Sequence, residues 1–224
     1  MQIALLHLLP GLAVGTFYLV TAEAFAAFGI PRLLALLLGF VLVGMPIQLV
    51  VISRSVVRNR EPLPIWQYLA GAVGLVVFIM LLLRLPLGVV SRYLATHVFA
   101  WLPPAFTPSA DDQLDACGRS IVLFTLVFQL IVDGIVNPIV EETYFRGVLL
   151  PRLGGLRWAA PVVNTLLFAL GHVWQPYNVV SIFIYVLPLT LFTWWRRNYY
   201  VQAFVHCLAN TFGAVLALVA FFRG

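Results

Sequence analysis

Long apolar runs, bounded by short segments that carry arginine, glycine or proline, restrict this chain more than any other feature. A transmembrane helix needs about 20 apolar residues, so several such runs predict several membrane crossings. We predict an all-α fold, a polytopic transmembrane helical bundle of about seven spans, within a range of six to eight. The predicted spans are residues 3–28, 32–53, 65–83, 119–150, 158–174, 178–195 and 199–222.

The charge content excludes an ordinary soluble domain. Of the 224 residues, 62% are hydrophobic and 9% are charged, whereas a soluble domain has about 25% charged residues. All 13 basic residues are arginines, and they lie between apolar runs. This distribution is typical of topology signals, so no nucleic-acid partner is expected. Cys117 and Cys207 stand alone and indicate neither a disulfide framework nor a zinc motif.

The arginine clusters predict an orientation. They fall at 54–60, 146–157 and 196–197, which seven spans place on one side, while an acidic segment at 111–115 falls on the other. Because positive loops remain inside, we expect these loops and the N-terminus in the cytoplasm. The expected location is a cell membrane, the inner membrane of a bacterium, with the protein as a multi-pass integral component. The apolar N-terminus predicts a first transmembrane helix rather than a cleaved signal peptide.

The segment 84–118 has a mixed composition. We expect an interfacial helix from Leu85 to Ala100, followed by a loop. An extra short span is the alternative reading.

Three groups of polar residues fall inside predicted spans of the second half, where ionisable side chains are costly and are functional candidates. They are Glu141 and Glu142 with Arg146, then Phe168 with His172, and then His206 with Asn210. Residues four apart share a helix face, so Glu142 can pair with Arg146. Glu141 is rotated by about 100° from Glu142 and stays free of that pair.

The depths of these groups agree. Glu141, His172 and His206 lie about nine to eleven residues from the arginine-rich ends of their helices, which is roughly 13–17 Å at 1.5 Å per residue. We therefore expect the three side chains to meet at one level inside the bilayer. Asp133, two turns before Glu141, either extends this network or lies near the far interface. His7 is expected at an interface without a functional role.

These residue types suit water activation. A carboxylate in an apolar site can act as general base, with an imidazole positioning the water or shuttling the proton. A second imidazole and a carboxamide can donate hydrogen bonds to an oxyanion. Zinc held by Glu141, His172 and His206 is the alternative, although no HExxH motif supports it. We expect no cofactor.

The three groups follow the pattern EExxxR, FxxxH and HxxxN, in this order, within about 70 residues. This pattern resembles that of the CPBP (CAAX protease and bacteriocin-processing, or Abi) family. The resemblance covers roughly 118–222, so we divide the chain into N-terminal transmembrane helices and loop (1–117) and a catalytic core (118–224).

The resemblance implies an intramembrane glutamate-type endopeptidase related to the Ras-converting CAAX protease. Glu141 and His172 would then activate the water, and His206 and Asn210 would form the oxyanion hole. Glu142 and Arg146 would be supporting residues.

The implied partners are the lipid bilayer and a membrane-anchored protein or peptide, which is cleaved during processing or sorting. The myxosortase-like sorting group is one possible subgroup. Three alternatives stay open: a non-catalytic immunity or scaffold protein of the same fold, a metal-dependent protease, and a buried polar network that only holds helices together. A transporter is disfavoured because the polar residues gather at one level.

Overall fold

The computed structural model describes residues 2–107 and 114–223, which form helices and no β-strand. The predicted all-α fold is confirmed. Asp111 and Asp112 of the predicted acidic segment lie outside the described residues.

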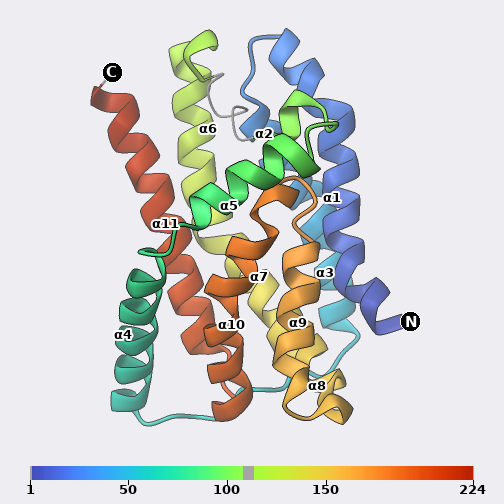
Figure 1. The fold of residues 1–224 in the computed structure, drawn as a ribbon, viewed down its shortest axis with the longest axis vertical. Coiled ribbons are helices and arrows are strands. Elements are labelled where there is room, and N and C mark those ends of the chain that lie inside the picture. The colour runs from blue at the N-terminus through green and yellow to red at the C-terminus, as the bar shows by residue number, and fades with distance from the viewer. Residues whose placement is uncertain (1, 108–113, 224) are drawn as a thin grey trace.

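Among the described residues, six helical segments are long and apolar enough to cross a membrane, and this number lies within the predicted range. In the first half of the chain they are α1 (Gln2–Ala27), then the continuous α2 (Arg32–Gly39), η1 (Phe40–Gly44) and α3 (Met45–Ser53), and then α4 (Ile65–Leu82). In the second half they are the continuous α6 (Arg119–Ile131), η5 (Val132–Val136), α7 (Asn137–Glu142), η6 (Thr143–Leu149) and α8 (Leu150–Arg152), then η8 (Pro176–Asn178) with α10 (Val179–Arg196), and finally α11 (Tyr200–Arg223). Most of these helices run along the long axis of the molecule (Figure 1).

The predicted span at 158–174 forms a shorter helix. Helix α9 (Ala159–Leu170), reached from α8 through the turn η7 (Gly154–Leu156), has 12 residues. Its length is about 18 Å, whereas the hydrocarbon core measures about 30 Å. Helix α10 packs along α9, and the tip of this hairpin stops short of the upper ends of α1 and α6 (Figure 1). The chain therefore turns back at an intermediate depth, directly after α9.

The described residues of the mixed segment 84–118 contain short helices and no helix long enough to span a membrane. Helix α5 (Leu87–Tyr93) continues into η2 (Leu94–Val98), and η3 (Pro104–Phe106) follows. Helix α5 contacts α10 and η8, and it runs obliquely across the bundle (Figure 1). It therefore covers the tip of the α9–α10 hairpin.

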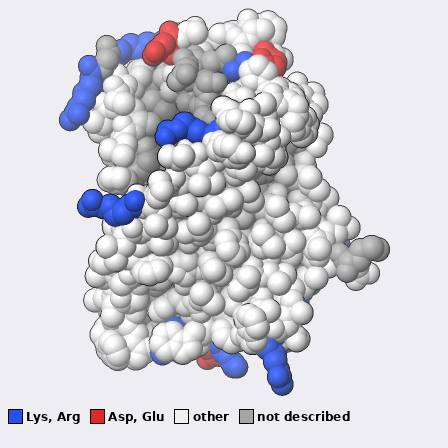
Figure 2. Space-filling view, viewed as in Figure 1, with Lys and Arg blue, Asp and Glu red and all other residues white. Residues whose placement is uncertain are grey.

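The three arginine-rich segments meet at one end of the bundle, as predicted. Arg152 donates a hydrogen bond of 2.7 Å to the Ser55 hydroxyl, and the Asn198 amide, next to Arg197, donates one of 2.7 Å to the backbone carbonyl of Glu61. Figure 2 shows charged side chains at both ends of the visible face and further basic groups down to about mid-height, with an uncharged band across the lower half above the bottom end. An uncharged band of this kind is expected where a bundle contacts lipid.

Helix α1 packs against the segment that follows α9 with little space between the backbones. A Cβ atom added to Gly11 would lie 1.9 Å from the Gly171 carbonyl oxygen, and one added to Gly15 would lie 2.3 Å from Val173 Cγ2. Only glycine permits this approach. The N-terminal helix therefore fixes the position of the chain on both sides of His172.

Candidate active site

Glu141 lies on α7, a short α-helical segment between two stretches of π-helix, η5 and η6. Pro138, in the first turn of α7, lacks the backbone N–H that a regular helix would use, and π-helical turns are frequent at functional sites. The Glu141 side chain is 6% exposed. It lines a central cavity that His172 also lines. Of the three side chains expected at one level, those of Glu141 and His172 therefore line the same cavity.

The central cavity lies between the two halves of the chain. Its walls leave about 20 Å³ for the centre of a water-sized sphere, which is enough for one water molecule. The second half contributes Asn137, Glu141, Phe145, Phe168, Gly171, His172 and Trp174. The first half contributes His7, Pro10, Gly11, Val14, Phe40, Gly44 and Gln48. Half of the wall therefore comes from helices for which no motif indicated a role.

His172 follows directly after the end of α9, and its ring is held by backbone and aromatic contacts. Its Nδ1 donates a hydrogen bond of 2.9 Å to the Phe168 carbonyl oxygen. A carbonyl only accepts, so Nδ1 carries the proton and Nε2 of the neutral ring keeps its lone pair. The rings of Phe168 and Trp174 lie 4.6 Å and 4.9 Å from the imidazole, measured between centroids. These contacts leave Nε2 as the basic atom of His172.

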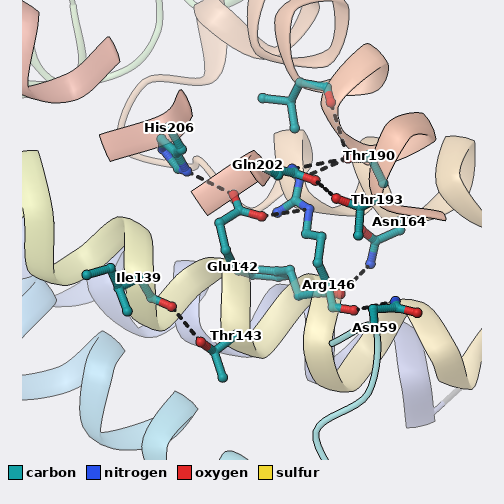
Figure 3. A network of polar contacts seen from close by, with 12 residues as sticks. Asn59, Ile139, Glu142, Thr143, Arg146, Asn164, Thr190, Thr193, Gln202 and His206 are labelled. Atoms are coloured by element: carbon teal, nitrogen blue, oxygen red, sulfur yellow. Dashed lines mark hydrogen bonds and ion pairs between the residues drawn. The ribbon is translucent and has the colours of Figure 1, made fainter. Parts of the chain in front are cut away.

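Glu142, Arg146 and His206 form a buried charged cluster (Figure 3). The Glu142 carboxylate lies 3.3 Å from Arg146 Nε, which confirms the predicted i, i+4 pair, and both side chains are at most 1% exposed. The other carboxylate oxygen lies 2.9 Å from His206 Nδ1. The guanidinium carbon of Arg146 lies 4.3 Å from the centre of the Phe168 ring. Glu142 therefore links the arginine to the histidine on α11.

The cluster continues into uncharged side chains that no motif indicated. Arg146 donates a hydrogen bond to the Thr190 hydroxyl at 3.3 Å. The Gln202 side-chain amide donates to the same hydroxyl oxygen at 3.4 Å, and the Thr193 hydroxyl donates to the Gln202 side-chain oxygen, Oε1, at 2.7 Å. Figure 3 shows this network bridging α10 and α11. Gln202 lies one turn before His206, so the two residues share a face of α11. This i, i+4 spacing is the sequence signal that could have indicated Gln202 as part of the network.

Asn210 contacts the π-helical segment before Glu141 rather than the wall of the central cavity. Its Nδ2 donates to the Asp133 carbonyl oxygen at 3.0 Å and lies 3.4 Å from the Asp133 carboxylate. Asp133 therefore extends the polar network, which is the first of the two positions expected for it from the sequence. Neither His206 nor Asn210 lines the cavity, although the rings of His206 and Phe168 are 6.4 Å apart between centroids.

The prediction that His7 lies at an interface is wrong. Its side chain is fully buried because α1 packs inward against α9. His7 Nδ1 donates to the Ile3 carbonyl oxygen at 2.8 Å, and its Nε2 accepts from the Asn164 amide at 2.9 Å. Both ring nitrogens are thus occupied, which leaves His7 a structural part of the cavity wall.

No group of three or more His, Cys, Asp and Glu side chains in the described part of the chain is arranged to hold a metal ion.

The fold and the site together define an integral, multi-pass membrane protein with an acid–imidazole cavity inside its helical bundle. A sequence profile described as type II CAAX prenyl endopeptidase Rce1-like matches residues 123–212, which include every predicted site residue from Glu141 to Asn210. Over this segment, which is less than half of the chain, the protein is similar to the CAAX protease (CPBP) family, whose members are described as endopeptidases. No curated protein and no solved structure matches the chain.

Proposed function

We propose that the protein is a glutamate-type intramembrane endopeptidase in which Glu141 and His172 activate a water molecule. One observation carries this proposal: the two side chains line the same cavity, whose volume suits one water. Glu141 is 6% exposed, so a water held beside it meets a carboxylate that is largely shielded from solvent.

The proposed reaction is the hydrolysis of one peptide bond. Glu141 accepts a proton from the water, directly or through Nε2 of His172, while the water oxygen attacks the scissile carbonyl carbon. The carbonyl π-electron pair moves to oxygen and gives a tetrahedral oxyanion. When this intermediate collapses, the C–N bond breaks and the leaving nitrogen takes up the proton that Glu141 held. The products are a new carboxyl terminus and a new amine.

His206 and Asn210 are proposed to donate hydrogen bonds to the oxyanion. His206 Nδ1 faces Glu142, so the opposite nitrogen, Nε2, is the one that a substrate can reach. It donates when the ring is doubly protonated, a state that the adjacent carboxylate favours. The Asn210 amide has two N–H bonds, and Asp133 can occupy one of them. The second N–H then serves the oxyanion.

The proposed substrate is a membrane-anchored protein or peptide that is processed or sorted in the bacterial cell membrane. A site at this depth favours a scissile bond close to an anchor that places it in the bilayer. A C-terminal anchor segment fits the sorting role, and a prenylated CAAX end is the anchor that the family description names. Both anchors are therefore included in the test.

We expect the protein in proteoliposomes to cleave one of two probes: a reporter with a C-terminal transmembrane anchor, or a farnesylated CAAX peptide with a fluorophore and quencher. Glu141→Gln should lower kcat by about 100-fold or more, because it removes the general base. Glu23→Gln is the matched control, because Glu23 pairs with Arg32 at 2.6 Å outside the central cavity. It should leave kcat unchanged.

Undiminished cleavage by Glu141→Gln would contradict the glutamate mechanism. Loss of activity with 1,10-phenanthroline, followed by recovery with zinc, would favour the metal-dependent alternative. A wild-type protein that binds the anchored probes but cleaves neither would favour the non-catalytic immunity or scaffold alternative.

A further inference from the structure

Gln48 is a buried polar residue that neither the motifs nor the family profile assigns. It lies on α3, in the run Met45–Ser53, among apolar neighbours. Its exposure is 4%. Helix α3 packs against α7, the segment that carries Glu141, and Gln48 lines the central cavity with Glu141 and His172.

The Gln48 side chain has an unused hydrogen-bond acceptor. Its Oε1 is buried and has no partner among the protein atoms. A buried carbonyl oxygen without a partner costs folding free energy, so such groups usually meet water or a ligand. The cavity that Gln48 lines has room for one water molecule. The unpaired acceptor and the water-sized space thus occur at the same place.

We propose that Gln48 is a catalytic residue that binds the reacting water through Oε1 and orients it. A water molecule has two hydrogens to donate and two lone pairs. If Glu141 accepts one hydrogen and Gln48 accepts the other, a lone pair of the water oxygen is left to face the substrate carbonyl carbon. His172 lines the same cavity as Glu141 and Gln48.

A carboxamide suits this role better than a second acid. It accepts a hydrogen bond at any working pH and does not compete with Glu141 for the proton. It adds no charge to an apolar wall, where a second charge would be costly. This assignment rests on the proposed function, because it places Gln48 on the water that Glu141 activates.

The kinetic test uses Gln48→Met, which keeps the length of the side chain but removes the acceptor. We expect kcat to fall about tenfold or more and KM to stay unchanged. The melting temperature should be unchanged or higher, because the variant removes a buried acceptor that has no partner. Thr165→Val is the matched control, because the Thr165 hydroxyl is also buried without a partner but does not line the cavity. It should leave kcat within twofold of the wild-type value.

A structure of the wild-type protein at about 2 Å resolution tests the same contact without substrate. We expect one ordered water within about 3.2 Å of both Gln48 Oε1 and the Glu141 carboxylate, and its loss or displacement in Gln48→Met. A water that does not contact Gln48, or a Gln48→Met variant with wild-type kcat, would overturn the role of Gln48. If Glu141→Gln is inactive in that case, the proposed function stands; full activity of Glu141→Gln would refute the proposed function itself.

Discussion

The buried cluster of Glu142, Arg146 and His206 shows how single residues support the site without lining the cavity. A charge without a partner inside an apolar bundle is far more costly than a neutral side chain of the same size. Glu142 balances Arg146 and also contacts Nδ1 of His206. The stability of the bundle and the orientation of His206 therefore depend on the same carboxylate.

Replacing one member of this pair should destabilise the protein strongly. We expect Arg146→Met to lower the free energy of unfolding by about 3–5 kcal/mol, because it removes the cation of a buried ion pair and leaves Glu142 with His206 as its remaining partner. The double variant Glu142→Gln/Arg146→Met should recover most of that loss yet stay poorly active, because His206 has lost its carboxylate. Thermal unfolding in detergent and the cleavage assay report the two effects separately. An Arg146→Met variant that melts like the wild type would show that the pair carries no net stability.

At the scale of elements, the contact between α1 and the end of α9 holds His172 in place. Gly11 touches the backbone of Gly171, the residue before His172. Backbone atoms cannot move aside as a flexible side chain can. The helix–helix distance is therefore set by the absence of a side chain at one position on α1.

Gly11→Ala should reduce both stability and activity. The added methyl group would overlap the Gly171 carbonyl oxygen at 1.9 Å, so α1 must shift and His172 must shift with it. Gly74→Ala on α4 is the control, because an added Cβ there meets no atom within 4 Å. It should be neutral or stabilising by up to about 1 kcal/mol. A Gly11→Ala variant with the melting temperature and kcat of the wild type would disprove the contact.

For the molecule as a whole, the arginine-rich end defines the predicted orientation. Val56 lies at that end and is 75% exposed, whereas Phe28 lies in the turn after α1 and is 82% exposed. With Cys117 and Cys207 replaced by serine, a membrane-impermeant maleimide should label Phe28→Cys in spheroplasts and Val56→Cys only in inverted vesicles. The opposite pattern would reverse the orientation. Labelling of both residues from the same side would contradict the bundle itself.

The sequence predicted those features that depend on local spacing. The Glu142–Arg146 pair follows from one helical turn, and the common end of the arginine-rich segments follows from the order of the spans. Helix α9 ends earlier than the predicted span 158–174, and Gly171 and Pro176 are the residues in the sequence that favour this early end.

The cavity itself could not be predicted. Gln48 and His7 are single polar residues in apolar runs, and only packing between distant segments shows which one faces Glu141. His7 is satisfied by Asn164 and by its own helix, whereas Gln48 keeps an unpaired oxygen. No spacing rule distinguishes these two situations.

The shared wall of the central cavity limits how this site can be transplanted. Residues 118–224 contain every motif residue, yet they supply only half of the surface that encloses the space beside Glu141. A chimera that joins this segment to unrelated N-terminal helices would keep the three motifs. It would lose Gln48 and the close contact between Gly11 on α1 and Gly171. The helices before residue 54 thus form part of the cavity wall beside Glu141, so unrelated membrane anchors cannot replace them without changing that wall.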